Sequence, residues 1–361
     1  MVSEVELAEV AKVFVQNGTP FETCPLGHGN IHDTFLLRAK NQDIVVQRLN
    51  STVFPFPEGI INNFNIVTQH LTTGAADNSA LVCALPVTTR QNTFGYESSH
   101  GNWWRAQTYV QHRTYQELQS TSQARRLGRI LGHFHNKVQN LNPQLLAVTL
   151  PNFHNLNFYW QEYSKVCQNI RIDQHKGDLR YCSGAAQQHY NKAAALQRGL
   201  DGQRVASQII HGDPKLENFM FDDSGKCLGL LDLDTVGSGC MYLDLGDCLR
   251  SCCNRAGERG GCSVSLDLGV MEEVLRGYFK VRQEHFSADS AKHIYRGILH
   301  ICFELALRFF TDYLKGNVYF KVLEKHDNLS RAISQFQLVE LLLEKREKIT
   351  EMIHDIDENS Q

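Results

Sequence analysis

Hydrophobic residues recur at helical spacing at the start of the chain and through most of its second half. Near the N-terminus, Ser3 and Glu6 have the spacing of a capping box, and the apolar positions between Val5 and Phe14 predict a helix behind it. Between residues 150 and 205 the helical pattern is interrupted by loops. The other predicted helices cover residues 122–138, 267–284, 290–314 and 330–356.

Short apolar runs of strand type dominate the region between the first helix and residue 110. They predict strands at residues 21–26, 34–38, 44–49, 81–87 and 103–110. A short helix is expected at residues 62–71, between the third and fourth of these strands. The pattern therefore predicts an α+β protein, with an antiparallel sheet within residues 1–110 and a mainly helical part in residues 111–361.

The chain has 361 residues, 42% of them hydrophobic and 21% charged, and this length accommodates two lobes with sizeable cores. A net charge of −3 argues against general binding to nucleic acid or to an anionic membrane surface, because both need an excess of Lys and Arg. Neither a signal peptide nor an apolar run that could span a membrane is visible, so we predict a cytoplasmic protein. The oligomeric state is left open.

The 11 cysteines are an odd number and lie mostly in apolar company, which suits reduced thiols rather than a disulfide framework. Cys248, Cys252, Cys253 and Cys262 are close in sequence but include no Cys-x-x-Cys pair. Packing in the core is therefore the expected role for this group, rather than zinc binding.

Candidate chemistry is concentrated in residues 211–218, which read His-Gly-Asp-Pro-Lys-Leu-Glu-Asn. Ile209 and Ile210 precede this stretch and an apolar triplet follows it, which predicts an exposed loop between short buried strands. A second apolar run ends on Asp232 after a turn. The resulting hairpin would bring Asn218 and Asp232 together.

These residues suit phosphoryl transfer, in which a protein positions two substrates and neutralises phosphate charge with a metal ion and cations. Asp213 is the candidate base for the proton of the attacking hydroxyl, and Lys215 would lie against the transferring phosphoryl group. Asn218 and Asp232 offer hard oxygen ligands for Mg²⁺. A lone His-Gly-Asp can also be a simple turn, but the spaced Lys, Asn and second Asp favour the catalytic interpretation.

Candidate nucleotide contacts lie in the predicted sheet and just after it. Gly27 and Gly29 form a turn between two strands, where backbone amides can point at a polyphosphate, although such turns are also common without a ligand. If the chain is a kinase, residues 107–112 would pass the base of ATP, with Tyr109 and Gln111 beside it.

Glu304, Arg308 and Asp312 follow one another at four-residue spacing and share one face of a predicted helix. They form either a surface salt-bridge ladder or a row with an internal arginine. In the second alternative Arg308 faces the loop that bears Asp213 and fixes a neutral polar substrate through its several donors.

Other polar positions are predicted to be structural. His133 and His135 lie two residues apart on a helix, so they cannot share a face and are not expected to bind a metal. Asp244, within residues 242–247, is expected to fix a turn.

His211, Gly212 and Asp213, together with Asn218 and Asp232, resemble the kinase-like aminoglycoside phosphotransferase superfamily. A narrower similarity, to bacterial N-acetylhexosamine 1-kinases, covers most of the chain. It rests on residues 27–35, 46–55, 211–250 and 308–320. This resemblance implies a two-lobed protein-kinase-like fold and transfer of the γ-phosphate of ATP to the anomeric hydroxyl of a hexosamine.

The resemblance also implies roles for single residues. Asp213 would be the base, Asn218 and Asp232 would be Mg²⁺ ligands, and Arg308 and Tyr319 would contact the sugar.

The sequence departs from these patterns at two places. The Gly-rich loop of these sugar kinases typically reads Gly-His-Ile-Asn, whereas residues 29–32 read Gly-Asn-Ile-His, which exchanges the polar residues Asn30 and His32 near the sugar. Gln47 occupies the strand position where protein kinases carry a phosphate-pairing lysine, a substitution that the narrower family shares. We expect Gln47 to face the nucleotide, with Lys215, Mg²⁺ and loop amides supplying positive potential.

Two rival functions remain. The chain could be a kinase of the same fold that acts on an amino alcohol, homoserine or an aminoglycoside, but a cationic acceptor would need a carboxylate-rich pocket, and the candidate acceptor helix presents Arg308 beside aromatic residues. It could also be a non-catalytic nucleotide-binding protein, as the missing lysine at position 47 would suggest. Retention of Asp213, Lys215 and both candidate metal ligands argues against that.

Overall fold

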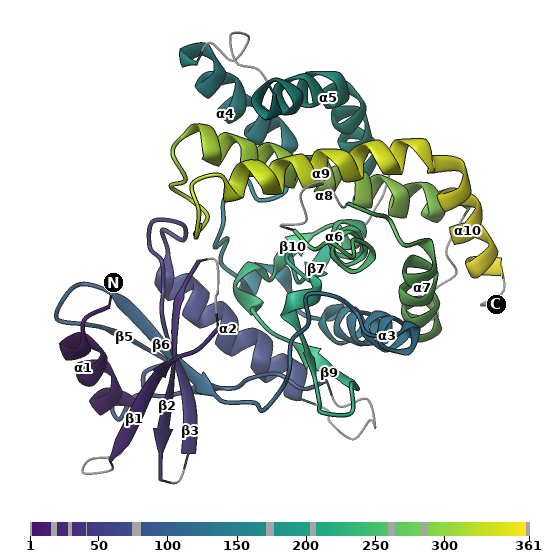
Figure 1. The fold of residues 1–361 in the computed structure, drawn as a ribbon. Coiled ribbons are helices and arrows are strands. Elements are labelled where there is room, and N and C mark those ends of the chain that lie inside the picture. The colour runs from purple at the N-terminus through teal and green to yellow at the C-terminus, as the bar shows by residue number, and fades with distance from the viewer. Residues whose placement is uncertain are drawn as a thin grey trace.

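The computed structural model describes residues 2–15, 20–27, 31–40, 42–73, 81–170, 177–202, 207–258, 264–282 and 288–358. The fold is α+β, as predicted, with a sheet in the first part of the chain and helices in the rest. Figure 1 shows the sheet at the lower left, with helices α1 (Glu4–Phe14) and α2 (Pro57–Thr72) against it. We call this part the N-lobe, and the helical part that follows it the C-lobe.

The N-lobe sheet is antiparallel, with strand order β1-β2-β3-β6-β4 and β5 paired to β6. Its strands are β1 (Phe21–Pro25), β2 (Asp33–Ala39), β3 (Gln42–Arg48), β4 (Pro86–Val87), β5 (Gly95–Glu97) and β6 (Trp103–Thr108). Gln47 on β3 lies directly opposite Arg105 on β6, and cross-strand partners point to the same face of a sheet. The lobe boundary at residue 110 remains a prediction.

Three elements of the N-lobe differ from the predicted ones. The expected strand at residues 81–87 is reduced to β4, and Val82 forms only an isolated bridge to Gly229. Strand β5 was not predicted, because it is three residues long and follows a polar turn. Helix α2 begins at Pro57, well before the predicted residue 62; proline suits a first helical position because the amide hydrogen it lacks would have no helical partner.

Helix α1 begins as predicted, because the Ser3 side chain accepts a hydrogen bond from the Glu6 amide at 3.2 Å. The Glu6 side chain does not complete a capping box, however. It is buried, and its carboxylate accepts hydrogen bonds from Ser98 at 2.8 Å, Asn102 at 2.8 Å and Trp104 at 3.0 Å. Glu6 therefore ties α1 to the end of the sheet.

The C-lobe consists mainly of helices, and none of the described helices is long and apolar enough to cross a membrane. They are α3 (Thr121–Val138), α4 (Leu156–Asn169), α5 (Asp178–Gly202), α6 (Met241–Cys253), α7 (Leu268–Arg282), α8 (Ala288–Leu314), α9 (Asp327–Glu344) and α10 (Arg346–Glu358). Two predictions were wrong. Residues 242–247 belong to α6 rather than to a turn, and the single helix expected at residues 330–356 is divided at Lys345 into α9 and α10.

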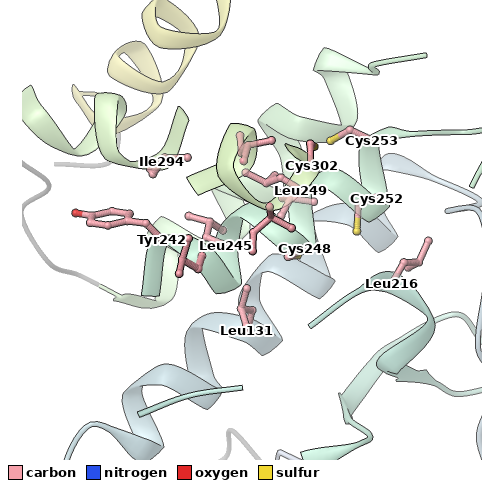
Figure 2. Packing of buried hydrophobic residues seen from close by; sticks show 14 of the residues in the cluster. Leu131, Leu216, Tyr242, Leu245, Cys248, Leu249, Cys252, Cys253, Ile294 and Cys302 are labelled. Carbon is pink, nitrogen blue, oxygen red and sulfur yellow. The ribbon is translucent and has the colours of Figure 1, made fainter. Parts of the chain in front are cut away.

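The core of the C-lobe is centred on α6 and α8. Figure 2 shows Cys248, Cys252 and Cys253 of α6 packed near Cys302 of α8, and all four are buried. The first three are core cysteines, as predicted, whereas Cys262 lies outside the described residues. Leu216, from the candidate loop, belongs to the same core.

Candidate active site

The loop at residues 211–218 leaves strand β7 (Gln208–Ile210), which pairs with β10 (Gly237–Gly239) beside α6 (Figure 1). Asp244, in the first turn of α6, holds its backbone: the carboxylate accepts hydrogen bonds from the amides of His211 at 2.6 Å and Gly212 at 2.8 Å. Burial alone would raise the pKa of Asp244, but the hydrogen bond from His135 at 3.0 Å and the backbone bonds lower it. Asp244 thus fixes the 211–218 loop, not a turn of its own.

Gly212 is required by the way this loop packs. It has a φ of +87°, and a Cβ atom there would lie 2.7 Å from the carbonyl oxygen of Thr235. The Thr235 hydroxyl in turn donates to the carbonyl of His211 at 2.9 Å. The loop is therefore in direct backbone contact with the segment that follows Asp232.

Asp213, Lys215 and Asn218 converge within the loop. The Lys215 ammonium lies 3.1 Å from the Asp213 carboxylate, and Asn218 Nδ2 donates to the Asp213 carbonyl at 2.7 Å and to its carboxylate at 3.1 Å. Although burial opposes charge on Lys215, the surrounding carboxylates, Asp213 first, raise its pKa. Because its Nδ2 faces Asp213, Asn218 has its Oδ1 available for a cation.

The predicted hairpin is present. Strand β8 (Phe219–Phe221) pairs with β9 (Cys227–Leu230), and the Leu231 amide donates to the Asn218 carbonyl at 2.7 Å. This pairing places Asp232 next to Asn218. Asp232 has a left-handed backbone, with φ 59° and ψ 67°, which a residue other than glycine adopts only when its surroundings hold it.

The donors around Asp232 fit a hard divalent cation. Asp232 remains accessible to solvent, yet partial desolvation and the charges of Asp234 and Asp213 raise its pKa. A bound cation would offset this repulsion between carboxylates, and the carboxylate and amide oxygens present are the ligands that Mg²⁺ prefers.

A second cluster, which residue spacing does not reveal, is centred on Asp234, two residues beyond Asp232. Asp234 is buried and accepts hydrogen bonds from Arg105, whose Nη2 lies 3.0 Å from Oδ2. Gln47 Oε1 accepts from Arg105 Nε at 3.0 Å and from Nη2 at 2.7 Å. The neighbouring strand therefore places a cation, Arg105, beside Gln47. Burial alone would raise the pKa of Asp234, but the charge of Arg105 and the hydrogen bonds from His32 and Arg105 lower it.

His32 belongs to this cluster rather than to an open acceptor pocket. Its Nε2 lies 2.8 Å from Asp234 Oδ2, and its Nδ1 accepts a hydrogen bond from the Asn50 amide at 3.0 Å. Only 8% of the residue is exposed. Both ring nitrogens are occupied by protein groups, and the sugar contact expected of His32 remains a prediction.

The other predicted nucleotide contacts are only partly described. Gly27 is exposed at the start of its turn, with a φ of +71°, whereas Gly29 and Asn30 lie outside the described residues. Tyr109 follows β6 and its amide donates to Asp43 at 3.3 Å, while Gln111 is exposed. Their contacts with ATP remain predictions.

Arg308 lies inside the protein, with 11% of its side chain exposed, so the surface-ladder alternative was wrong. Its guanidinium carbon lies 5.0–5.5 Å from the ring centres of Phe153, Tyr159, Tyr319 and Phe320. Its Nη2 also donates to the Tyr319 hydroxyl at 3.3 Å. Two of the residues predicted to contact the acceptor, Arg308 and Tyr319, therefore contact each other.

The other two members of the row on α8 are structural. Glu304 is buried and lies 3.3 Å from His154 Nδ1, while His154 Nε2 contacts the Gly212 carbonyl at 3.0 Å. Asp312 accepts hydrogen bonds from the backbone amides of residues 318–320. Glu304 thus connects Arg308 to the 211–218 loop, and Asp312 positions the segment that carries Tyr319.

Solved structures with the same fold are known. They include an aminoglycoside phosphotransferase from Alicyclobacillus acidocaldarius, with 13% identity, a TM-score of 0.61 and coverage of 97% of this chain and 96% of that one. A microcompartment-associated aminopropanol kinase has 14% identity, a TM-score of 0.63 and coverage of 95% and 98%. A spectinomycin phosphotransferase, solved with ADP and spectinomycin, has 10% identity, a TM-score of 0.57 and coverage of 99% of each chain.

These similarities place the molecule in the class of two-lobed, protein-kinase-like folds. The model of the phosphotransferase enzyme family, APH, matches residues 22–280, and the chain belongs to this family. It is a phosphotransferase that acts on a hydroxyl acceptor.

Proposed function

We propose that this phosphotransferase is an ATP-dependent sugar 1-kinase, which phosphorylates the anomeric hydroxyl of an N-acetylhexosamine or a related neutral sugar. The observation that carries the proposal is the position of Arg308, whose guanidinium is enclosed by aromatic rings and linked through Glu304 and His154 to Gly212, next to Asp213. Reduced thiols and the use of ATP make the cytoplasm the location we propose.

Asp213 is the group that takes the proton from the attacking hydroxyl. An anomeric hydroxyl is more acidic than the other hydroxyls of a sugar, so one carboxylate of a loop held by Asp244 and Gly212 is a sufficient base. Lys215, 3.1 Å from Asp213, provides positive charge at the point where the phosphoryl group is transferred.

Asn218 Oδ1 and the Asp232 carboxylate are the groups that would hold Mg²⁺. When bound, the ion would neutralise phosphate charge and polarise the γ-phosphoryl group, which would favour its attack by the hydroxyl. The chain itself contributes the fixed separation of these ligands, because the β8–β9 pairing and the bond from the Leu231 amide to the Asn218 carbonyl hold the two residues side by side.

Arg308 argues for a neutral acceptor. Aromatic rings around an empty space can hold an ammonium group of a ligand, but here the protein's own guanidinium occupies that position. A cationic amino alcohol would meet a fixed positive charge, whereas hydroxyl and acetamide oxygens of a sugar can accept hydrogen bonds from Arg308 and Tyr319. The positive charge of Arg308 therefore favours a neutral sugar over a cationic amino alcohol as the acceptor.

A coupled assay of ADP release over a panel of acceptors tests the proposal. The panel comprises free hexoses, N-acetylhexosamines, choline, homoserine and an aminoglycoside, with Asp213→Asn protein as the blank. We expect turnover with one or more hexosamines that disappears in the blank. Turnover only with choline, homoserine or the aminoglycoside would contradict the sugar assignment. If none of the acceptors is turned over, a nucleotide-binding role would be favoured.

A further inference from the structure

Asp234 is a meeting point of three segments that are far apart in the sequence. Arg105 of β6 and His32, which precedes β2, both bind its carboxylate, at 3.0 Å and 2.8 Å. Thr149, in the segment after α3, donates from its hydroxyl to the Asp234 carbonyl at 2.8 Å. Both carboxylate partners come from the N-lobe, so Asp234 fastens the N-lobe to the segment that contains Asp232.

The hydrogen bonds fix which atoms of His32 donate. Its Nδ1 faces the Asn50 amide at 3.0 Å and must accept that bond, so its proton is on Nε2 and is donated to Asp234. The ring also stacks on Phe54, with centres 5.3 Å apart. The imidazole therefore has one tautomer and one orientation, and it sets the position of the Asp234 carboxylate.

Arg105 is fixed just as tightly from the sheet side. Its Nε and Nη2 donate to Gln47 Oε1, its Nη1 and Nη2 donate to the two oxygens of Asp234, and its guanidinium lies 4.8 Å from the ring centre of Phe64 on α2. Only 2% of the residue is exposed. The planar guanidinium group can donate to Gln47 and to both Asp234 oxygens at once, whereas a single lysine ammonium could not make all of these hydrogen bonds.

The neighbouring Asp232 has a strained backbone, with φ 59° and ψ 67°, and needs such support. Since ligand atoms of a metal site are oriented by the groups behind them, we propose that Arg105 and His32 are positioning residues that hold residues 232–234 in the conformation that binds Mg²⁺–nucleotide. Gln47 acts through Arg105, as its orienting partner. This inference rests on the proposed function, because that function makes Asp232 the metal ligand.

Isothermal titration of ADP into Arg105→Gln protein, with Mg²⁺ and with EDTA, tests this role. We expect roughly a 10- to 100-fold loss of affinity for ADP in Mg²⁺ and little change in EDTA. Arg105→Lys should share the loss, because one ammonium cannot bind Gln47 and both Asp234 oxygens. The control is Arg125→Gln, which removes an ion pair of 2.6 Å between α3 and α7, and it should bind as the wild type does.

Three results of the titration would overturn the inference. An equal loss with and without Mg²⁺ would make Arg105 a direct phosphate contact, and unchanged affinity would leave it a purely structural residue. Full affinity in Arg105→Lys would show that charge suffices without the fork. If Arg105→Gln does not fold, His32→Leu keeps the Arg105–Asp234 pair, and should still lose affinity only when Mg²⁺ is present.

Hydrogen exchange without nucleotide separates failure of this inference from failure of the proposed function. The amides of Leu231 and Val236 are hydrogen bonded, so peptides that cover residues 231–236 should exchange faster in Arg105→Gln and His32→Leu than in wild type or Arg125→Gln. Equal exchange in all four proteins would refute the positioning role. Wild-type protein that binds no Mg²⁺–ADP would instead refute the proposed function, whatever the exchange shows.

Discussion

The 211–218 loop and the Arg105–Asp234 cluster both adjoin Asp232, the first through Asn218 and the second through Asp234, but they are built in different ways. The loop carries Asp213, Lys215 and Asn218 on one continuous stretch. The cluster takes Gln47, Arg105, His32 and Asp234 from four separate segments. The proposed reacting groups are thus local in sequence, whereas the groups proposed to support them make long-range contacts, and only the first kind can be found by spacing.

Asp213→Asn should show the largest effect, because it removes the base and leaves the loop intact. Asn has nearly the same shape and still accepts the bond from Asn218, which now measures 3.1 Å. We expect kcat to fall roughly 10²- to 10⁴-fold while ADP affinity changes little. Steady-state kinetics and titration of ADP measure both; near-normal turnover would remove Asp213 from the chemistry.

Lys215→Ala and Gln47→Ala compare the two regions directly. Lys215 lies in the loop and touches Asp213, so its loss should lower kcat about 10²-fold. Gln47 is proposed to act through Arg105, and its loss should lower activity about tenfold. Kinetics of the two variants side by side give the ranking, and the reverse order would mean that the essential cation is held by the sheet.

Arg308→Ala should affect the acceptor more than the nucleotide. The guanidinium and the Tyr319 hydroxyl, 3.3 Å apart, lie at the proposed sugar site. We expect the KM for the sugar to rise about tenfold or more, with the KM for ATP nearly unchanged. Asp223→Ala, which breaks an exposed ion pair with Arg113, is a suitable control. A parallel rise in both KM values would contradict the assignment.

Glu9→Gln should have the smallest effect, because the partners of Glu9, Tyr96 and Ser99, belong to neither region. Hydrogen bonds from the Ser99 hydroxyl, Tyr96 and the Ser99 amide lower the pKa of Glu9 from 4.5 to about 2. A depressed pKa in the folded state stabilises the protein above the unfolded value and not below the folded one. The wild type should therefore melt above Glu9→Gln at pH 7, and the gap should close between pH 4.5 and about 2. Thermal melts across this pH range measure the difference in Tm between wild type and Glu9→Gln, with Glu22→Gln as the control. A difference that does not change with pH would contradict the pairing of Glu9.

Much of the local geometry of the candidate site could be predicted, because hairpins and loops form between residues that are close in sequence. The turn between β8 and β9 lies within a short stretch, so Asn218 and Asp232 were expected to meet, and they do. Helix α6 was missed for a physical reason. Glycine weakens a helical pattern, and residues 242–247 include Gly246, which allows α6 to approach Gly297 on α8, where a Cβ atom would lie 2.5 Å from a backbone carbon.

Arg105 could not be assigned from its own strand. It alternates with the buried Trp104 and Ala106, a pattern that places Arg105 on the other face of the strand, and there it contacts Asp234 from a distant part of the chain. The signal that could have found it is Gln47: a neutral residue where a lysine is expected raises the question of which neighbouring strand supplies the charge. For His32 the contact with Asp234 is too distant in sequence for any spacing rule.

The product itself tests the central claim most directly. Phosphorus NMR of a reaction with ATP and an N-acetylhexosamine, together with a reducing-sugar assay, reports which hydroxyl accepts the phosphoryl group; Asp213→Asn protein serves as the blank. We predict a resonance coupled to the anomeric proton and a loss of reducing power that matches the ADP formed. A phosphorylated product that still reduces would place the phosphate on another hydroxyl and contradict the 1-kinase assignment.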